Sequence, residues 1–133
     1  MNDKLRPGLK GQSEIVVTED RLANAVGSGL VSVLATVMMI AGMESTAVDT
    51  VQPVLDEGYT TVGTHVDVSH EAATPLGMKV RFTAELMEVS ANGKGLVFHV
   101  EAHDENGLIG QGIHKRVVVH KESFENRTRA KKA

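Results

Sequence analysis

The segment LATVMMIAGMESTAV, residues 34–48, is an apolar run that contains a single carboxylate, Glu44. Between Arg21 and Asp49 no other residue carries a charge at neutral pH. Desolvation of an isolated carboxylate is costly unless a cation pairs with it or a proton neutralises it. Two questions follow for this segment: which structure surrounds it, and what keeps Glu44 within it.

A helix is the predicted structure of this apolar segment, from about residue 37 to residue 52. Pro53 cannot continue a helix and is expected to end it. Thr36 is a suitable N-cap because its hydroxyl can accept a hydrogen bond from a free N–H group. A helix that is apolar on nearly all sides has to be enclosed by the rest of the chain.

A membrane-spanning helix is the competing interpretation of residues 22–43, because about 20 apolar residues can cross a bilayer. The strongly apolar part, residues 33–43, is only half of that length and lacks basic and aromatic flanks. The preceding part is interrupted by polar and flexible residues, namely Asn24, Gly27, Ser28, Gly29 and Ser32. We therefore expect a buried helix and no membrane as partner.

Downstream of Pro53 the apolar residues alternate with polar ones, as in strands with one buried face. Residues 60–70 are predicted to place Val62, Val66 and Val68 on the buried face. Continued alternation along this strand would place His70 at the end of the same buried face. Residues 13–17, SEIVV, predict a further short strand near the N-terminus.

Three more strands are predicted in residues 78–88, 95–104 and 108–120. Asn-Gly pairs at 92–93 and 106–107 separate them, and this dipeptide is a strong hairpin signal. An antiparallel meander is therefore expected. Glycines at positions 110 and 112 would let the last strand bend closely over the helix.

One apolar helix and one antiparallel sheet with a single apolar face predict an α+β hot-dog fold, in which the sheet wraps around the helix. We expect a single domain over residues 1–133. The polar, basic tail from about residue 121 is expected to be a frayed end or a short solvated helix.

Composition excludes several classes of protein. A chain of 133 residues with a formal charge of −3 fits one domain and offers no reason to expect a nucleic acid as partner. The absence of cysteine excludes disulfides and thiolate metal sites. The polar start lacks the apolar core of a secretory signal, so a cytoplasmic location is expected.

Glu44 has two interpretations: an inert carboxylate at the edge of a subunit interface, or a base or nucleophile with a perturbed pKa. His70 is either a core histidine or the second member of a site. Thr36 lies where a helix N-terminus favours negative charge. Thr36 and Glu44 are separated by roughly 12 Å of helix rise, so they would have to bracket a substrate.

His99, Glu101 and His103 share one strand face and indicate a metal site only weakly, since that face is expected to be exposed to solvent. The segment HEAAT is not a zinc-protease motif, because Thr74 stands where the second histidine is needed. No metal site and no cofactor are predicted.

The segments LATVMMIAGMES, VGTHVDVSHEAATPLG, FTAEL and GIHKRVVVH resemble the hot-dog thioesterases related to fluoroacetyl-CoA thioesterase, over roughly residues 5 to 125. The resemblance implies that Thr36, Glu44 and His70 are catalytic. It implies substrate binding by Gly63, which would help to position the substrate, and by Arg116, near the thioester. It also implies homodimers with two acyl-CoA sites at the subunit interface.

The segment before the helix departs from that family. In the fluoroacetyl-specific enzyme, phenylalanines there form a lid over the acyl group, whereas this chain has LANAVGSGLVSV. We therefore expect thioester hydrolysis but not that substrate. A hot-dog protein that binds acyl-CoA without turnover, and a hydratase or dehydratase of acyl thioesters, are the alternatives. The acyl chain, the carrier (CoA or acyl carrier protein) and pairing of dimers into tetramers stay open.

Overall fold

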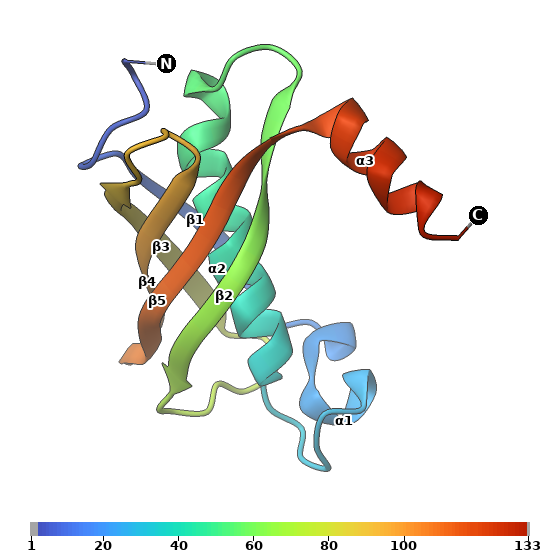
Figure 1. Cartoon of the computed structure of the whole chain (residues 1–133). Helices are drawn as coiled ribbons and strands as arrows, with labels where there is room; N and C mark the ends of the chain where they lie inside the picture. The colour runs from blue at the N-terminus through green and yellow to red at the C-terminus, as the bar shows by residue number, and fades with distance from the viewer. Residues whose placement is uncertain (1–2, 133) are drawn as a thin grey trace.

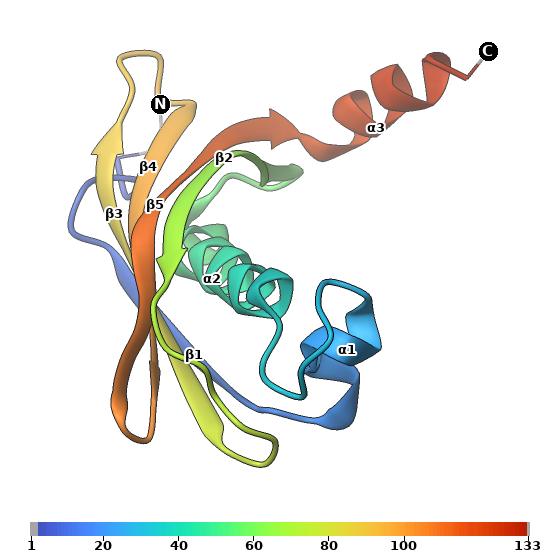
Figure 2. The same ribbon diagram turned by 90° about the horizontal axis from the view of Figure 1, so that it is seen from below.

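The computed structural model describes residues 3–132. Five antiparallel strands form one sheet in the order β1-β3-β4-β5-β2. Their bounds are Lys10–Val16 (β1), Tyr59–His70 (β2), Lys79–Val89 (β3), Gly95–Asp104 (β4) and Gly107–His120 (β5). The sheet curves around helix α2 (Thr36–Val51), which lies on its concave side (Figures 1 and 2). This arrangement confirms the predicted hot-dog fold and the meander β3-β4-β5.

The remaining elements are short. They are η1 (Glu19–Arg21), α1 (Ala23–Val26), η2 (Gln52–Val54) and α3 (Lys121–Ala130). Helix α3 is the basic tail, and it projects away from the body on the side of β2 (Figure 2). Within residues 3–132, no helix is long and apolar enough to cross a membrane. The outermost residues of the expected 1–133 domain lie outside the described range.

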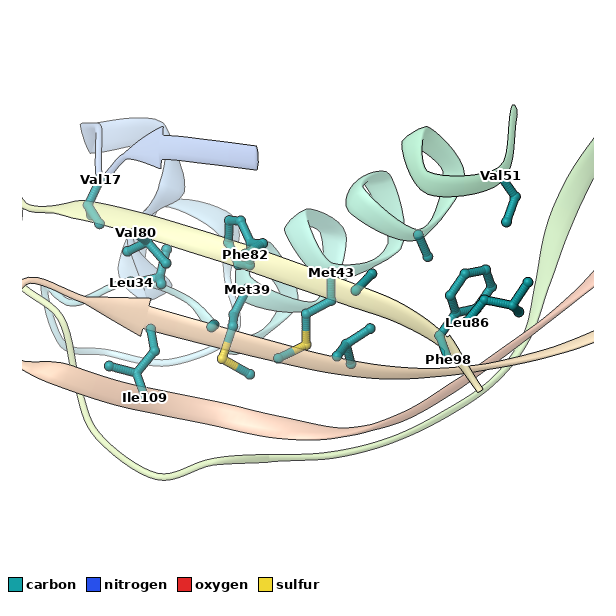
Figure 3. Close-up of a cluster of buried hydrophobic side chains, with 14 of the residues drawn as sticks. Val17, Leu34, Met39, Met43, Val51, Val80, Phe82, Leu86, Phe98 and Ile109 are labelled. Atoms are coloured by element: carbon teal, nitrogen blue, oxygen red, sulfur yellow. The ribbon is translucent and has the colours of Figure 1, made fainter. Parts of the chain in front are cut away.

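The core lies between α2 and the concave face of the sheet (Figure 3). Side chains at every fourth position of α2 are at most 1% exposed, namely Met39, Met43, Ala47 and Val51. Glycines allow close approach of helix and sheet. A Cβ at Gly42 would lie 2.3 Å from the Phe82 ring, and one at Gly110 would lie 2.6 Å from Met39 Sδ. The predicted close approach of the last strand to the helix is thereby confirmed at Gly110.

The sheet covers one side of α2 and leaves a flank of the helix uncovered, where Val37 is 49% exposed. The predicted N-cap of α2 is wrong. The N-cap is Ala35 and not Thr36, which is the first helical residue and whose hydroxyl bonds to a histidine instead. The helix ends one residue before the predicted boundary, and Pro53 lies in the 3-10 turn that follows.

A β-bulge in β2 changes the predicted alternation. Register shifts between Gly63 and His65, so Gly63 pairs with Arg116 whereas Val66 pairs with His114. Odd-numbered residues face α2 before the bulge, and even-numbered residues face it afterwards. The prediction that Val62 shares a face with Val66 is therefore wrong. His70 does lie on the inner face, opposite Gly110.

Strand β1 starts earlier than predicted and ends one residue sooner. It begins at Lys10 rather than at residue 13, because Lys10 still pairs with Glu85 of β3. Val17 follows the strand and is buried in the core. The short apolar motif marks only the half of β1 that contributes to the core.

Candidate active site

The first group of candidate residues joins the start of α2 to the end of β2. Thr36 Oγ1 and His70 Nδ1 are 2.7 Å apart and share a hydrogen bond. The other ring nitrogen, His70 Nε2, is buried and has no hydrogen-bond partner among the described residues. The first bonds of α2 run from Met38 and Met39 to the Ala35 carbonyl, which leaves the N–H groups of Thr36 and Val37 without a helical partner. Hydrogen-bond donors and a histidine therefore converge here.

The second group surrounds the carboxylate of Glu44. Arg116 Nη1 lies 3.4 Å from Glu44 Oε2, and His114 Nε2 lies 3.9 Å from the same oxygen. The Glu44 side chain is 41% exposed, whereas those of Arg116 and His114 are 7% and 1% exposed. A buried cation thus lies on one side of this carboxylate and water on the other, so the acid on this apolar helix is neither isolated nor fully desolvated.

Arg116 is held by four hydrogen bonds. Its Nε donates to Thr61 Oγ1 at 2.7 Å and its Nη2 to the Thr61 carbonyl at 3.0 Å. Its Nη1 contacts both His114 Nε2, at 3.0 Å, and Glu44. These contacts fix the guanidinium plane beneath the Glu44 carboxylate.

Gly63 provides the space that the carboxylate occupies. A Cβ built at Gly63 would lie 2.8 Å from Glu44 Oε2 and 3.3 Å from Arg116 Nη1. The glycine is thus required here by close approach of a side chain and not by backbone conformation, because its φ is not positive. A larger residue at this position would displace the Glu44 carboxylate.

Burial shifts three pKa values at these two groups. It lowers the pKa of His70, and the backbone of Ala72 offsets part of that effect. It also lowers the pKa of His114, against a smaller raising effect of the His65 backbone. The pKa of Arg116 is likewise lowered by burial, with the charge of Glu44 acting in the opposite direction. Both histidines are therefore biased toward their neutral forms.

Thr36 and His70 contact each other, and Glu44 contacts Arg116 beside Gly63, but no hydrogen bond or ion pair links the two groups within residues 3–132. An open hollow of about 320 Å³ lies beside Thr36 and His70. Its apolar lining comes from small and branched side chains, namely Ala23, Val31, Val33, Leu34, Ala72 and Ala73. An acyl group could enter there.

The remaining histidine cluster lies on the opposite face of the sheet. His99 Nε2 and His103 Nε2 approach the Glu101 carboxylate at 2.8 and 3.6 Å. Across residues 3–132, no set of three histidine or acidic side chains is arranged to hold a metal ion.

His114 and Thr61 are the functional candidates that sequence reasoning missed. The signal for His114 was present, because the alternation that turns Gly110 and Gly112 toward α2 also turns His114 and Arg116 toward it. Thr61 could not be found in this way. Its inward direction depends on the bulge, which has no local motif here.

Comparison with known proteins supports a thioesterase assignment. Residues 17–122 match the family described as FlK, fluoroacetyl-CoA-specific thioesterase. The fluoroacetyl-CoA thioesterase of Streptantibioticus cattleyicolor is 42% identical over 99 residues, which cover 74% of this chain and 70% of that protein.

Solved structures agree with this assignment. A threonine-to-serine variant of the fluoroacetyl-CoA thioesterase FlK in complex with acetyl-CoA superimposes with a TM-score of 0.89, at 34% identity over 96% of this chain and 99% of that chain. A thioesterase superfamily member from Thermus thermophilus has a TM-score of 0.87, at 30% identity over 96% and 93% of the two chains. The chain therefore belongs to the fluoroacetyl-CoA-specific thioesterase family, and it is a hot-dog enzyme that hydrolyses acyl-CoA thioesters.

Proposed function

We propose that Glu44, His70 and Thr36 carry out the hydrolysis. Glu44 attacks the thioester carbonyl or activates the water that does so. Neutral His70 accepts a proton from that water, or from the water that hydrolyses the acyl-glutamate anhydride, and gives it to the CoA thiolate. Thr36 and the free N–H groups at the start of α2 stabilise the oxyanion, at about 3 kcal/mol per donor. The observation that carries this proposal is the half-exposed Glu44 carboxylate held by a buried arginine.

Two protomers are needed to bring these residues together. Thr36 and Glu44 are eight positions apart on α2, and Gly63 and His70 are seven apart on β2. Strand β2 is paired on one side only, with β5, so its other edge can pair with a second copy. Val37 is 49% exposed and follows Thr36, whose hydroxyl contacts His70 at the end of β2. We therefore infer a homodimer built on β2.

Symmetry determines which residues would meet in such a dimer. In an antiparallel strand pair, the numbers of facing residues have a constant sum. Facing residues also share a face of the sheet, and the bulge at Thr64 lowers this sum by one. A twofold axis at Asp67 of β2 would therefore place the partner subunit's Ser69 opposite His65 and the partner subunit's His70 opposite Gly63. The same axis would bring the partner subunit's Thr36 toward Glu44. Each site would then combine the Glu44 group of one protomer with the Thr36–His70 pair of the other.

Arg116 is proposed to act on the substrate through Glu44. Only 6% of this residue is exposed, and its donors are directed at Thr61, His114 and Glu44. This environment favours an ion pair with Glu44 as its role, rather than contact with CoA phosphates. Gly63 is proposed to bind substrate through its backbone, beside the carboxylate.

The acyl group is proposed to be a small aliphatic one without fluorine. The hollow beside Thr36 and His70 is lined by alanine, valine and leucine side chains, and the preceding segment contains no aromatic residue. Aliphatic side chains offer dispersion contacts and no specific partner for a carbon–fluorine dipole.

The test is release of free thiol from a panel of acyl-CoAs, including acetyl-, fluoroacetyl-, branched short-chain and enoyl-CoA. We expect the highest kcat/KM with an unfluorinated aliphatic substrate. A preference for fluoroacetyl-CoA would contradict the proposed specificity. Saturable binding without thiol release would contradict the proposed catalysis, and so would a change in enoyl absorbance without release of CoA.

A further inference from the structure

His114 is the most deeply buried titratable group near Glu44, and the proposed mechanism leaves it without a role. Its side chain is 1% exposed, and its ring lies between the bulge of β2 and the guanidinium of Arg116. Nδ1 is 2.8 Å from the His65 carbonyl, at the residue where the register of β2 shifts. Nε2 is 3.0 Å from Arg116 Nη1.

These two contacts determine the tautomer of His114. A backbone carbonyl can only accept a hydrogen bond, so Nδ1 must carry the proton. A guanidinium can only donate, so Nε2 must present its lone pair. A cationic ring would direct an N–H group at the N–H groups of Arg116. The neutral ring with a proton on Nδ1 is therefore the form that satisfies both partners.

We propose that His114 is a positioning residue for the hydrolysis: it orients the Arg116 guanidinium so that one oxygen of Glu44 is tied and the other faces the substrate. Within residues 3–132, the hydrogen bond and ion pair of Glu44 with Arg116 and its 3.9 Å approach to His114 Nε2 all involve Oε2. Oε1 is thus the atom left for reaction. Burial, which lowers the pKa of His114, supports the neutral form. The proposal rests on the proposed catalytic role of Glu44.

Two amide substitutions separate the two hydrogen bonds of the ring. In His114→Gln the amide oxygen can replace Nε2 and accept from Arg116, whereas in His114→Asn the amide nitrogen can replace Nδ1 and donate to His65. We expect His114→Asn to lower kcat by about 10- to 100-fold with KM nearly unchanged, since misorientation of a reacting group has effects of that size. The Gln variant should stay within a few-fold of wild type.

The matched control is His103→Asn, which makes the same change at a partly buried histidine on the convex face of the sheet. It should leave kcat unchanged. Equal losses in His114→Asn and His114→Gln would indicate a packing role and overturn the proposal. A folded His114→Asn enzyme with wild-type kcat would do the same.

Nitrogen-15 NMR of the wild-type imidazole tests the proposal even if the variants fail to fold. We expect a protonated Nδ1 and an unprotonated Nε2 for His114 at neutral pH. A protonated Nε2 would overturn the proposal, since that atom could not accept from Arg116. Failure of the wider mechanism is distinguishable, because Glu44→Gln would then retain activity.

Discussion

Glu44 lies on an apolar helix, yet 41% of its side chain is exposed and Arg116 lies 3.4 Å from Oε2. Such a partly exposed ion pair contributes about 1 kcal/mol or less to stability, because water screens it. The ion pair therefore adds little to the stability of the fold. Stability alone does not explain why this helix carries an acidic residue. A chemical role explains it better.

The Glu44→Gln enzyme tests that role. The amide keeps the shape and can still accept a hydrogen bond from Arg116, but it removes the charge and the nucleophile. We expect a folded protein that binds acyl-CoA and loses on the order of 10² to 10⁴ in kcat, the scale of a positioned base or nucleophile. Steady-state thiol release measures the loss. Asp49→Asn, on an exposed position of the same helix, is the control, and near-wild-type turnover by Glu44→Gln would refute the mechanism.

His70 predicts a pH dependence. Burial lowers its pKa from the usual value of 6.5. If the neutral ring accepts a proton in the rate-limiting step, kcat/KM is low while His70 is cationic and rises as pH passes its folded pKa. The rise is therefore expected below pH 6.5.

The pH profile of His70→Gln provides the comparison, because an amide does not titrate. That variant should lose the acidic limb that the wild type shows. A wild-type profile that is flat between about pH 5 and pH 8, with chemistry rate-limiting, would remove His70 from the proton transfer.

Two residues of the candidate site lie on β2, namely Gly63 at an odd-numbered position and His70 at an even-numbered one. The bulge between Gly63 and His65 lets both of them face α2. If Thr64 took a regular place in the alternation, a strand that turned Gly63 inward would also turn residues 65, 67 and 69 inward, and His70 outward. The bulge is thus the element that lets one edge strand turn both Gly63 and His70 toward α2.

Deletion of Thr64 tests this role. Without this residue, regular alternation still turns both Gly63 and His70 inward and keeps Gly63 opposite Arg116 and His65 opposite Lys115, so we expect the deletion variant to fold and to keep kcat within a few-fold of wild type. Thr64→Ala is the control, since this residue is exposed and its hydroxyl makes one 3.2 Å bond to the Lys115 carbonyl. Measurements of thiol release and circular dichroism compare the two variants. A folded deletion variant whose kcat falls by about 100-fold or more would show that the local backbone of the bulge is itself needed to position the site.

The whole molecule is expected to function as a homodimer, because one copy leaves the Glu44 group separate from the Thr36–His70 pair. Light scattering should give twice the mass of 14.2 kDa. A stable monomer at micromolar concentration would contradict both the dimer and a site shared across it.

Mixed dimers test the shared site directly. Glu44→Gln and His70→Ala should each be nearly inactive alone. Co-expressed in equal amounts, they should recover about a quarter of wild-type activity, since half of the dimers are mixed and each mixed dimer has one intact site. The control pairs Glu44→Gln with Thr36→Ala/His70→Ala, which should recover the same fraction. No recovery in dimers shown to be mixed would place all catalytic residues of a site in one protomer.

Local patterns in the sequence determined the elements of this protein. Alternation from residue 78 to residue 120, together with two Asn-Gly pairs, predicted the meander, and one apolar segment predicted α2. These features are readable because backbone period and turn conformation depend on residues that are close in the chain. Thr36, Glu44 and His70 were also selected from the sequence, as an isolated acid, an inward histidine and a helix start, and their catalytic roles stay predictions.

Tertiary structure decided how those residues are paired. Thr36 bonds to His70 across 34 positions, and Glu44 contacts Arg116 across 72. Both contacts depend on the register of β2 against β5, which a single extra residue changes. Such a bulge satisfies long-range packing and need not leave a local signature. For this reason Thr36 was expected to cap its helix, Val62 was assigned to the wrong face and His114 was missed, although the elements that carry them were predicted correctly.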